Sequence, residues 1–378
     1  SRADGDRRAT AQVQARKREL RHRTSTAGAF LGGLHLATGS DPTGRGALSF
    51  GSREAAEAVR DARASGANAL VLAPQAACVA EARVWPGERR SEPFETATPD
   101  ASVYAAAAHA HSAGLVVVLA PQLLDSRSGT WSGATMSSSR ERWSSFFDEL
   151  EASSLHYALL GELCNARVLC LAEELDQATK SIYSEEERPW VPSYFYENRA
   201  RWKTLIEHVR PAFRGALTYA ARGPSGNTSE ARELEFWSDL DFVAFTVFGA
   251  LSAPDAPLVV PDDATVIARA TANLQALLNF ARTLDKPVLL FELGVGAGAA
   301  NALDLECAPG AVDASEQARL VRCYGEALRR VRAQAWPLAG VFLYSWSIDP
   351  QDSASDQRTF SLRDRAAAAA LPKLFAGK

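Results

Sequence analysis

Short apolar runs alternate with longer amphipathic segments along most of this chain. The expected strands cover residues 29–36, 69–73, 115–120, 168–172, 216–219, 242–248, 288–291 and 341–346. Apolar runs without polar alternation are typical of a parallel sheet that helices cover. The clearest expected helices cover residues 52–65, 140–164, 199–209, 264–284 and 314–335. Ser52 is the predicted N-cap of the first, because its hydroxyl suits the exposed backbone N–H groups of a helix start.

The alternation predicts the fold class α/β, as a (β/α)8 TIM barrel, since it makes about eight strand–helix units. Such a barrel takes roughly 250 residues before insertions, so we expect residues 26–378 to form one enlarged domain. Residues 1–25 carry eight Arg or Lys, and we expect them to be a polar leader or linker outside it. Loops that should wall a cleft at the carboxyl ends of the strands cover residues 74–99, 121–139, 173–195, 220–233, 249–261 and 293–312.

Charge and hydropathy narrow the range of partners. The chain has 41 basic and 45 acidic residues and a pI near 6.0, so no basic field predicts nucleic-acid binding. It has no apolar run of about 18 residues, so we expect no transmembrane segment in it. The sequence begins at Ser1 and not at a Met, which is compatible with a signal peptide or membrane anchor before it. We therefore leave localisation open but favour a secreted, periplasmic or membrane-anchored protein over a cytoplasmic one.

The five cysteines do not indicate a metal site. Cys78, Cys164, Cys170, Cys307 and Cys323 contain no CxxC pair, so we expect no zinc and no other metal or cofactor. Two interpretations of the last pair stay open: a Cys307–Cys323 disulfide in an oxidising compartment, or buried free thiols.

Two acidic residues end apolar runs and are the candidate catalytic pair. Glu174 follows the fourth expected strand and Glu292 follows the seventh, so their side chains should meet at the mouth of a closed barrel. Two carboxyl groups about 5 to 5.5 Å apart are what retaining glycoside hydrolysis needs, one as acid and one as nucleophile. Glu173 competes for the acid role. Strand alternation favours Glu174, because it places Val168, Cys170, Ala172 and Glu174 on one face.

Aromatic residues are expected at the same face, where flat rings can stack on sugar rings. They are Trp131, Trp190, Tyr194, Tyr196, Tyr219, Phe248, Tyr344 and Trp346. Their shared location favours a carbohydrate substrate as the partner of this chain.

Several segments resemble glycoside hydrolase family 113. The similar segments are 109–121 (HAHSAGLVVVLAP), 129–133 (GTWSG), 170–175 (CLAEEL), 202–223, 237–245 (WSDLDFVAF), 286–294 (KPVLLFELG) and 340–346 (GVFLYSW). The resemblance implies a retaining β-glycosidase of the β-mannanase type. It further implies that Glu174 is the acid/base, Glu292 the nucleophile and Trp346 a platform for the sugar.

The chain departs from the family pattern at four expected substrate-binding positions. Gln122 replaces a His and Arg222 replaces an Asn, while Thr246 and Phe248 replace an Asp and a Tyr. Arg222 suits an anionic sugar if it points into the cleft, and otherwise pairs with Glu230 or Glu233 on its own loop. The departures bear on the choice of glycan more than on hydrolysis. They also keep an alternative open, a non-catalytic carbohydrate-binding or scaffold barrel.

Overall fold

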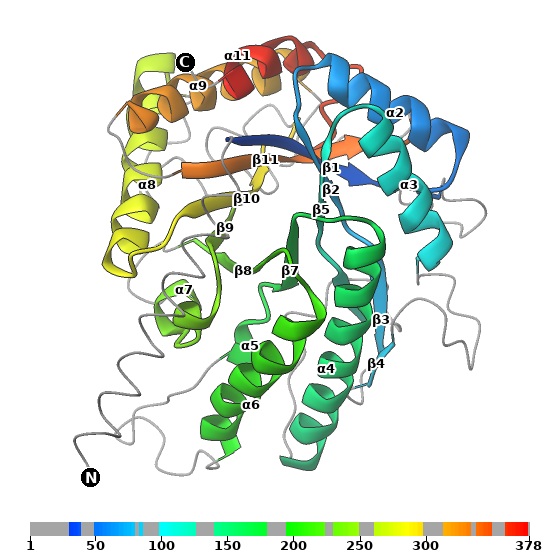
Figure 1. Ribbon diagram of the computed structural model, residues 1–378. Coiled ribbons are helices and arrows are strands. Elements are labelled where there is room, and N and C mark those ends of the chain that lie inside the picture. The colour runs from blue at the N-terminus through cyan, green and yellow to red at the C-terminus, as the bar shows by residue number, and fades with distance from the viewer. Residues whose placement is uncertain are drawn as a thin grey trace.

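The computed structural model confirms the closed parallel barrel of eight strands (Figure 1). It describes residues 30–38, 49–79, 83–85, 98–125, 140–179, 194–223, 230–248, 261–297, 313–333, 338–349 and 360–376. In barrel order the strands are β1 (Leu31–Ala37), β2 (Ala69–Leu72), β5 (Val116–Leu119), β7 (Val168–Glu173), β8 (Ala216–Arg222), β9 (Val243–Val247), β10 (Val288–Gly294) and β11 (Leu338–Ser347). Parallel pairing of β1 with β11, from Leu31 with Gly340 onward, closes the barrel.

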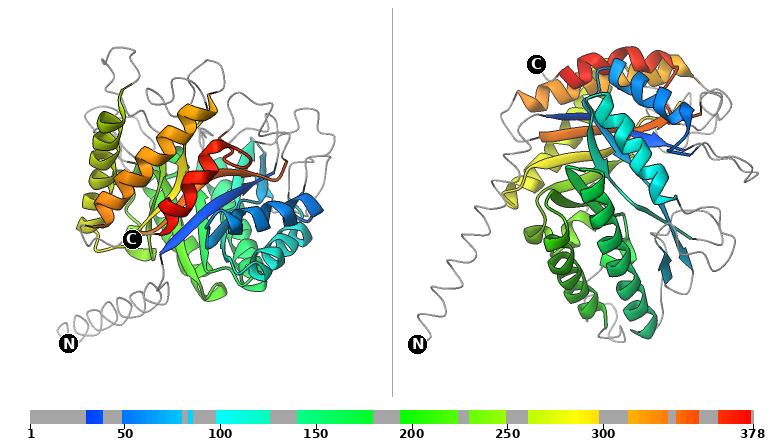
Figure 2. Two further views of the ribbon diagram at one scale, coloured as in Figure 1. Left: turned by 90° about the horizontal axis from the view of Figure 1, so that it is seen from above. Right: turned by 45° about the vertical axis from the view of Figure 1, so that its right-hand side comes forward.

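Helices surround the barrel on its outside (Figures 1 and 2). They are α2 (Arg53–Ala64), α3 (Asp100–Ser112), α4 (Arg140–Leu163), α5 (Asp176–Thr179), α6 (Tyr194–Val209), α7 (Glu230–Glu233), α8 (Asp263–Thr283), α9 (Ala314–Arg332) and α11 (Leu371–Ala376). The predicted cap of α2 is confirmed, because Ser52 Oγ accepts the Ala55 N–H at 3.1 Å. Short 3₁₀ turns lie at Arg210–Ala212, Trp237–Asp239 and Ala366–Ala370.

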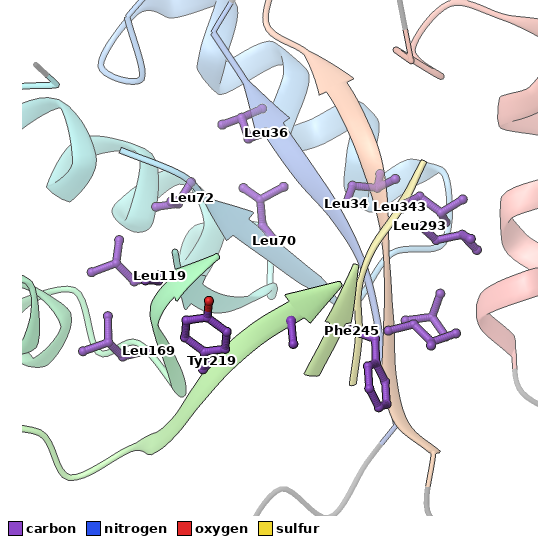
Figure 3. Close-up of a cluster of buried hydrophobic side chains, with 14 of the residues drawn as sticks. Leu34, Leu36, Leu70, Leu72, Leu119, Leu169, Tyr219, Phe245, Leu293 and Leu343 are labelled. Carbon is purple, nitrogen blue, oxygen red and sulfur yellow. The ribbon is translucent and has the colours of Figure 1, made fainter. Parts of the chain in front are cut away.

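Side chains from the barrel strands form two separate buried clusters. The outer cluster fills the space between strands and helices, and Figure 3 shows Leu34, Leu70, Leu169 and Phe245 among its members. The inner cluster fills the barrel interior with Leu31, Ala69, Val71, Val118, Ala120, Val168, Cys170, Ala216, Ala220, Phe242, Ala244, Leu289, Phe291 and Phe342. The interior is therefore packed with side chains, and chemistry is confined to its ends.

Two of the expected loops contain a second, smaller sheet. Strands β3 (Gln75–Val79), β4 (Arg83–Trp85) and β6 (Gln122–Asp125) pair in the order β4-β3-β6. β3 follows barrel strand β2 and β6 follows barrel strand β5, and they pair in parallel from Gln75 with Gln122 onward. The expectation of plain loops at 74–99 and 121–139 was therefore wrong where β3, β4 and β6 lie.

Candidate active site

Two carboxyl groups meet at the carboxyl ends of β7 and β10. Glu173 ends β7 and Glu292 lies within β10; they are 8% and 6% exposed. Their side chains are hydrogen-bonded to each other. Both strands lose regular register just before these residues, between Cys170 and Glu173 and between Leu290 and Glu292.

The irregularity of β7 overturns the alternation expected from the sequence. Val168 and Cys170 face the barrel interior, but Leu171 and Ala172 both belong to the outer cluster. Ala172 and Glu174 therefore do not continue the face of Val168 and Cys170. Glu173 is the carboxyl in contact with Glu292.

Glu174 lies at the rim and is held by its backbone and by both of its carboxylate oxygens. Its φ is 47°, in the left-handed region that non-glycine residues rarely occupy. Its N–H donates to the carbonyl of Ala220 at 2.9 Å. Arg222 Nη2 donates to Glu174 Oε2 at 2.8 Å, and Thr246 Oγ1 donates to Oε1. A left-handed residue fixed by this many contacts is typical of a functional position.

Tyr219 supports this turn from behind and does not line the site. Its ring is fully buried in the outer cluster, and its hydroxyl oxygen accepts the Leu175 N–H at 2.7 Å (Figure 3). The same hydroxyl donates to Glu230, whose Oε2 accepts the Arg222 N–H at 3.0 Å. The expected substrate contact of Tyr219 was wrong, because this residue points to the helix side of β8.

Arg222 is directed to Glu174. The sequence left two alternatives open for its guanidinium, the cleft or a pair with Glu230 or Glu233. In the structure the guanidinium donates to Glu174, while Glu230 accepts the backbone N–H of Arg222. Half of the Arg222 side chain is exposed. A guanidinium therefore stands at the rim beside a candidate catalytic carboxylate.

Burial raises the pKa of both carboxyls of the Glu173–Glu292 pair. Desolvation, more than the nearby charge of Glu174, raises the pKa of Glu173 to about 8, although a contact from Gln122 Nε2 to Oε2 at 3.4 Å lowers it. Desolvation and then the charge of Glu173 hold the pKa of Glu292 well above its usual range. Like charges this close disfavour double ionisation, so the pair retains a proton at neutral pH.

His35 is a site residue that the sequence analysis missed. It lies on β1, with Nδ1 3.6 Å from Glu292 Oε1, and its Nε2–H donates to the carbonyl of Phe291 at 2.6 Å. Burial lowers the pKa of His35 to about 4, so the ring is neutral at pH 7 and Nδ1 is an acceptor. The available signal was one polar residue in an otherwise apolar strand.

Tyr344 and Phe248 are the expected aromatic residues that the structure brings to the Glu292 side of the mouth. The Tyr344 ring lies 5.9 Å from His35 and 5.7 Å from Phe248, and Phe360 packs against both aromatic rings. Burial, and then the charges of Glu292 and Glu173, raise the pKa of the Tyr344 hydroxyl.

The expected platform role of Trp346 was wrong. Its indole is buried in the outer cluster, and Nε1–H donates to the Ala58 carbonyl of α2 at 2.9 Å. Other expected residues lie outside the described part of the chain: Trp131, Trp190, Cys307 and the side chains of Tyr194 and Tyr196.

The arrangement can perform proton transfer and nucleophilic attack. It combines a buried carboxyl pair, a rim carboxylate on an arginine and a neutral imidazole. Within the described ranges, no group of three or more His, Cys, Asp or Glu is suited to hold a metal ion. None of the helices that the structure describes is long and apolar enough to cross a bilayer.

Solved structures share this fold at low sequence identity. A β-1,4-mannanase of family 113, solved as a complex, is 18% identical with a TM-score of 0.70, over 93% of this chain and all of that one. The family 113 β-mannanase AaManA from Alicyclobacillus acidocaldarius, solved with ManMIm, is 20% identical with a TM-score of 0.70, over 92% and 97%. A GH5_18 protein variant from Bifidobacterium longum, solved with Manb1-4GlcNAc, is 12% identical with a TM-score of 0.55, over 91% and 78%.

Family membership rests on the sequence itself. No curated protein matches the chain. The model of Glycoside Hydrolase Family 113, however, matches residues 44–365, a range that includes Glu173, Glu174 and Glu292. The barrel, the carboxyls at its mouth and this match together show that the chain belongs to Glycoside Hydrolase Family 113.

Proposed function

We propose that this protein is a retaining β-glycosidase that hydrolyses a β-mannan-like or other β-linked polysaccharide or oligosaccharide. Glu292 is the nucleophile and Glu174 is the acid/base. The observation that carries the proposal is the cluster of carboxyls at the ends of β7 and β10, in a chain of a glycoside hydrolase family.

The direct hydrogen bond between Glu173 and Glu292 favours Glu174 over Glu173 as the acid. A retaining pair holds the glycosidic bond between carboxyls about 5 to 5.5 Å apart, and two hydrogen-bonded carboxyls leave no such space. Glu174 lies one residue further along the chain, at the rim, and its charge contributes to the raised pKa of Glu292.

The reaction takes two steps with balanced proton transfer. In the first step Glu292 attacks the anomeric carbon while the bond to the leaving oxygen breaks, and that oxygen takes a proton from the Glu174 carboxyl. In the second step Glu174 takes a proton from water, the water oxygen bonds to the anomeric carbon, and Glu292 is released.

One observation favours a second candidate, a barrel that binds a glycan without cleaving it. Both carboxylate oxygens of Glu174 accept hydrogen bonds, one from Arg222 and one from Thr246. A proton donor has to give up one of these contacts. If substrate does not displace it, Glu174 stays a bound carboxylate and turnover fails.

The test is hydrolysis of a panel of β-linked glycans, including mannan, glucan, chitosan and peptidoglycan strands. The native chain is compared with Glu174→Gln and Glu292→Gln, and with Glu207→Gln on the exposed face of α6 as a control. We expect one glycan class to be cleaved with retained anomeric configuration by the native chain and the control. Loss of about 10²-fold or more is expected in each site variant. Binding of a glycan without any cleavage would favour the second candidate.

A further inference from the structure

Glu173 is a buried carboxyl that the two-step reaction does not use. Its residue is 8% exposed, it contacts Gln122 at 3.4 Å, and it is hydrogen-bonded to the carboxyl of Glu292. Removing a carboxyl from water costs free energy unless a partner compensates for the loss. The contact with Glu292 is that partner, and it compensates only while a proton lies between the two groups.

Among the residues that the structure describes, none supplies a positive charge beside the pair to replace that proton. Glu174, which directly follows β7, adds negative charge, and its own Arg222 partner is at the rim. His35 on β1 is neutral because burial lowers its pKa to about 4. Two further titratable groups face the pair, the Cys170 thiol on β7 and the Tyr344 hydroxyl on β11. Burial raises the pKa of each, so both stay neutral.

We propose that Glu173 is a positioning residue that shares a proton with Glu292 and thereby sets when Glu292 becomes a nucleophile. With two protons on the pair, Glu292 is neutral and cannot attack. With one proton on the pair, the proton lies on Glu292 and Glu173 accepts the hydrogen bond; Glu292 becomes a nucleophile when that proton moves across to Glu173. Oε1 of Glu292, which has no hydrogen-bond partner among the described residues, is then available for the anomeric carbon. This inference rests on the proposed function of Glu292.

The first test is the pH profile of kcat/KM for Glu173→Gln and Glu173→Leu. The Gln amide still donates to Glu292 but carries no charge, so the acidic limb should move to lower pH by about one unit, the size expected when a neighbouring like charge is removed. Glu173→Leu has no donor, and we expect it to lose most activity at every pH. Glu207→Gln, the exposed control, should keep the native profile. An acidic limb in Glu173→Gln that coincides with the native one would overturn the proposal.

The second test needs no substrate. The folded pair holds protons that the unfolded carboxyls release above their ordinary pKa of about 4.5, so the native Tm should fall as pH rises from 5 to 8. We expect a shallower fall in Glu173→Gln and an unchanged fall in Glu207→Gln. If Tm falls less steeply in Glu173→Gln but the native chain cleaves no glycan, the shared proton is supported and the proposed function is contradicted. An unchanged fall, with cleavage intact in the native chain, would remove the shared proton alone.

Discussion

At the scale of single residues, consecutive glutamates have opposite environments. Glu173 is buried against another carboxyl, whereas Glu174 turns outward through a left-handed φ and meets an arginine. Their separation depends on the Glu174 N–H bond to Ala220 and the Leu175 N–H bond to Tyr219. The backbone of one turn therefore assigns the two neighbours different chemistry.

His35 should make the fold sensitive to acid. Its folded pKa of about 4 lies below the ordinary 6.5, so the unfolded chain binds a proton there first as pH falls, and stability is lost from pH 6.5 to 4. The loss from this group is about 3 kcal/mol, since one pKa unit corresponds to about 1.4 kcal/mol. Between pH 7 and pH 4 the free energy of unfolding should fall in both proteins. We expect the fall in His35→Gln to be about 3 kcal/mol smaller than the fall in the native chain. Urea unfolding at the two pH values measures it, and equal losses would contradict the assignment.

Substitution of Tyr344 should affect substrate binding, whereas substitution of Trp346 should affect only stability. Trp346→Phe removes the hydrogen bond to the Ala58 carbonyl, so we expect a loss of about 1 kcal/mol in stability with unchanged kcat/KM on the glycan found by the panel. Tyr344→Ala removes the ring beside Glu292 and should raise KM several-fold. Kinetics and urea unfolding of both variants check this. A KM effect confined to Trp346→Phe would restore the platform expected from the sequence.

At the scale of helices and strands, local signals agree with the structure where one residue sets a boundary. The Ser52 cap of α2 is the clearest case. We expect Ser52→Ala to lower the free energy of unfolding by about 1 kcal/mol, while Ser52→Asp keeps the acceptor and stays near the native value. Urea unfolding measures both, and equal losses in the two variants would show that the hydrogen-bond acceptor at this position is not the cause.

The barrel strands could be predicted because each is a continuous apolar run, but three features of the site could not. β3 and β6 are short and begin at Gln75 and Gln122, so they look like loops in the sequence. The irregularities in β7 and β10 depend on pairing between strands distant in sequence. The meeting of His35 with Glu292 depends on barrel closure, so no local pattern indicates it.

At the scale of the whole molecule, the barrel closes between its first and last strands, and α11 covers β1. The left view of Figure 2 shows α11 along the outer side of β1, and a Cβ on Gly32 would lie 2.6 Å from the Phe375 ring. The site needs this closure, because β1 carries His35 while β10 carries Glu292. Loss of the cover should therefore affect folding as a whole.

Phe375→Ala tests the importance of this cover. Phe375 is 6% exposed, and truncating such a buried ring costs about 3 kcal/mol or more. Leu159 on α4 is 60% exposed and is the matched control, since Leu159→Ala should change stability by less than about 0.5 kcal/mol. Thermal and urea unfolding compare the two variants. Similar losses would mean that α11 contributes little to closure.

The small sheet of β3, β4 and β6 also bears on how such an enzyme diversifies. Barrels usually acquire new substrates by exchanging the loops above their strands. Here two of those connections are joined by a backbone ladder from Gln75 with Gln122 onward, so replacing one connection would unpair the other. Single-residue substitution along that sheet leaves the ladder intact and can still change specificity. Gln122 is the position where a substitution would act most directly on the site, because its side chain contacts Glu173.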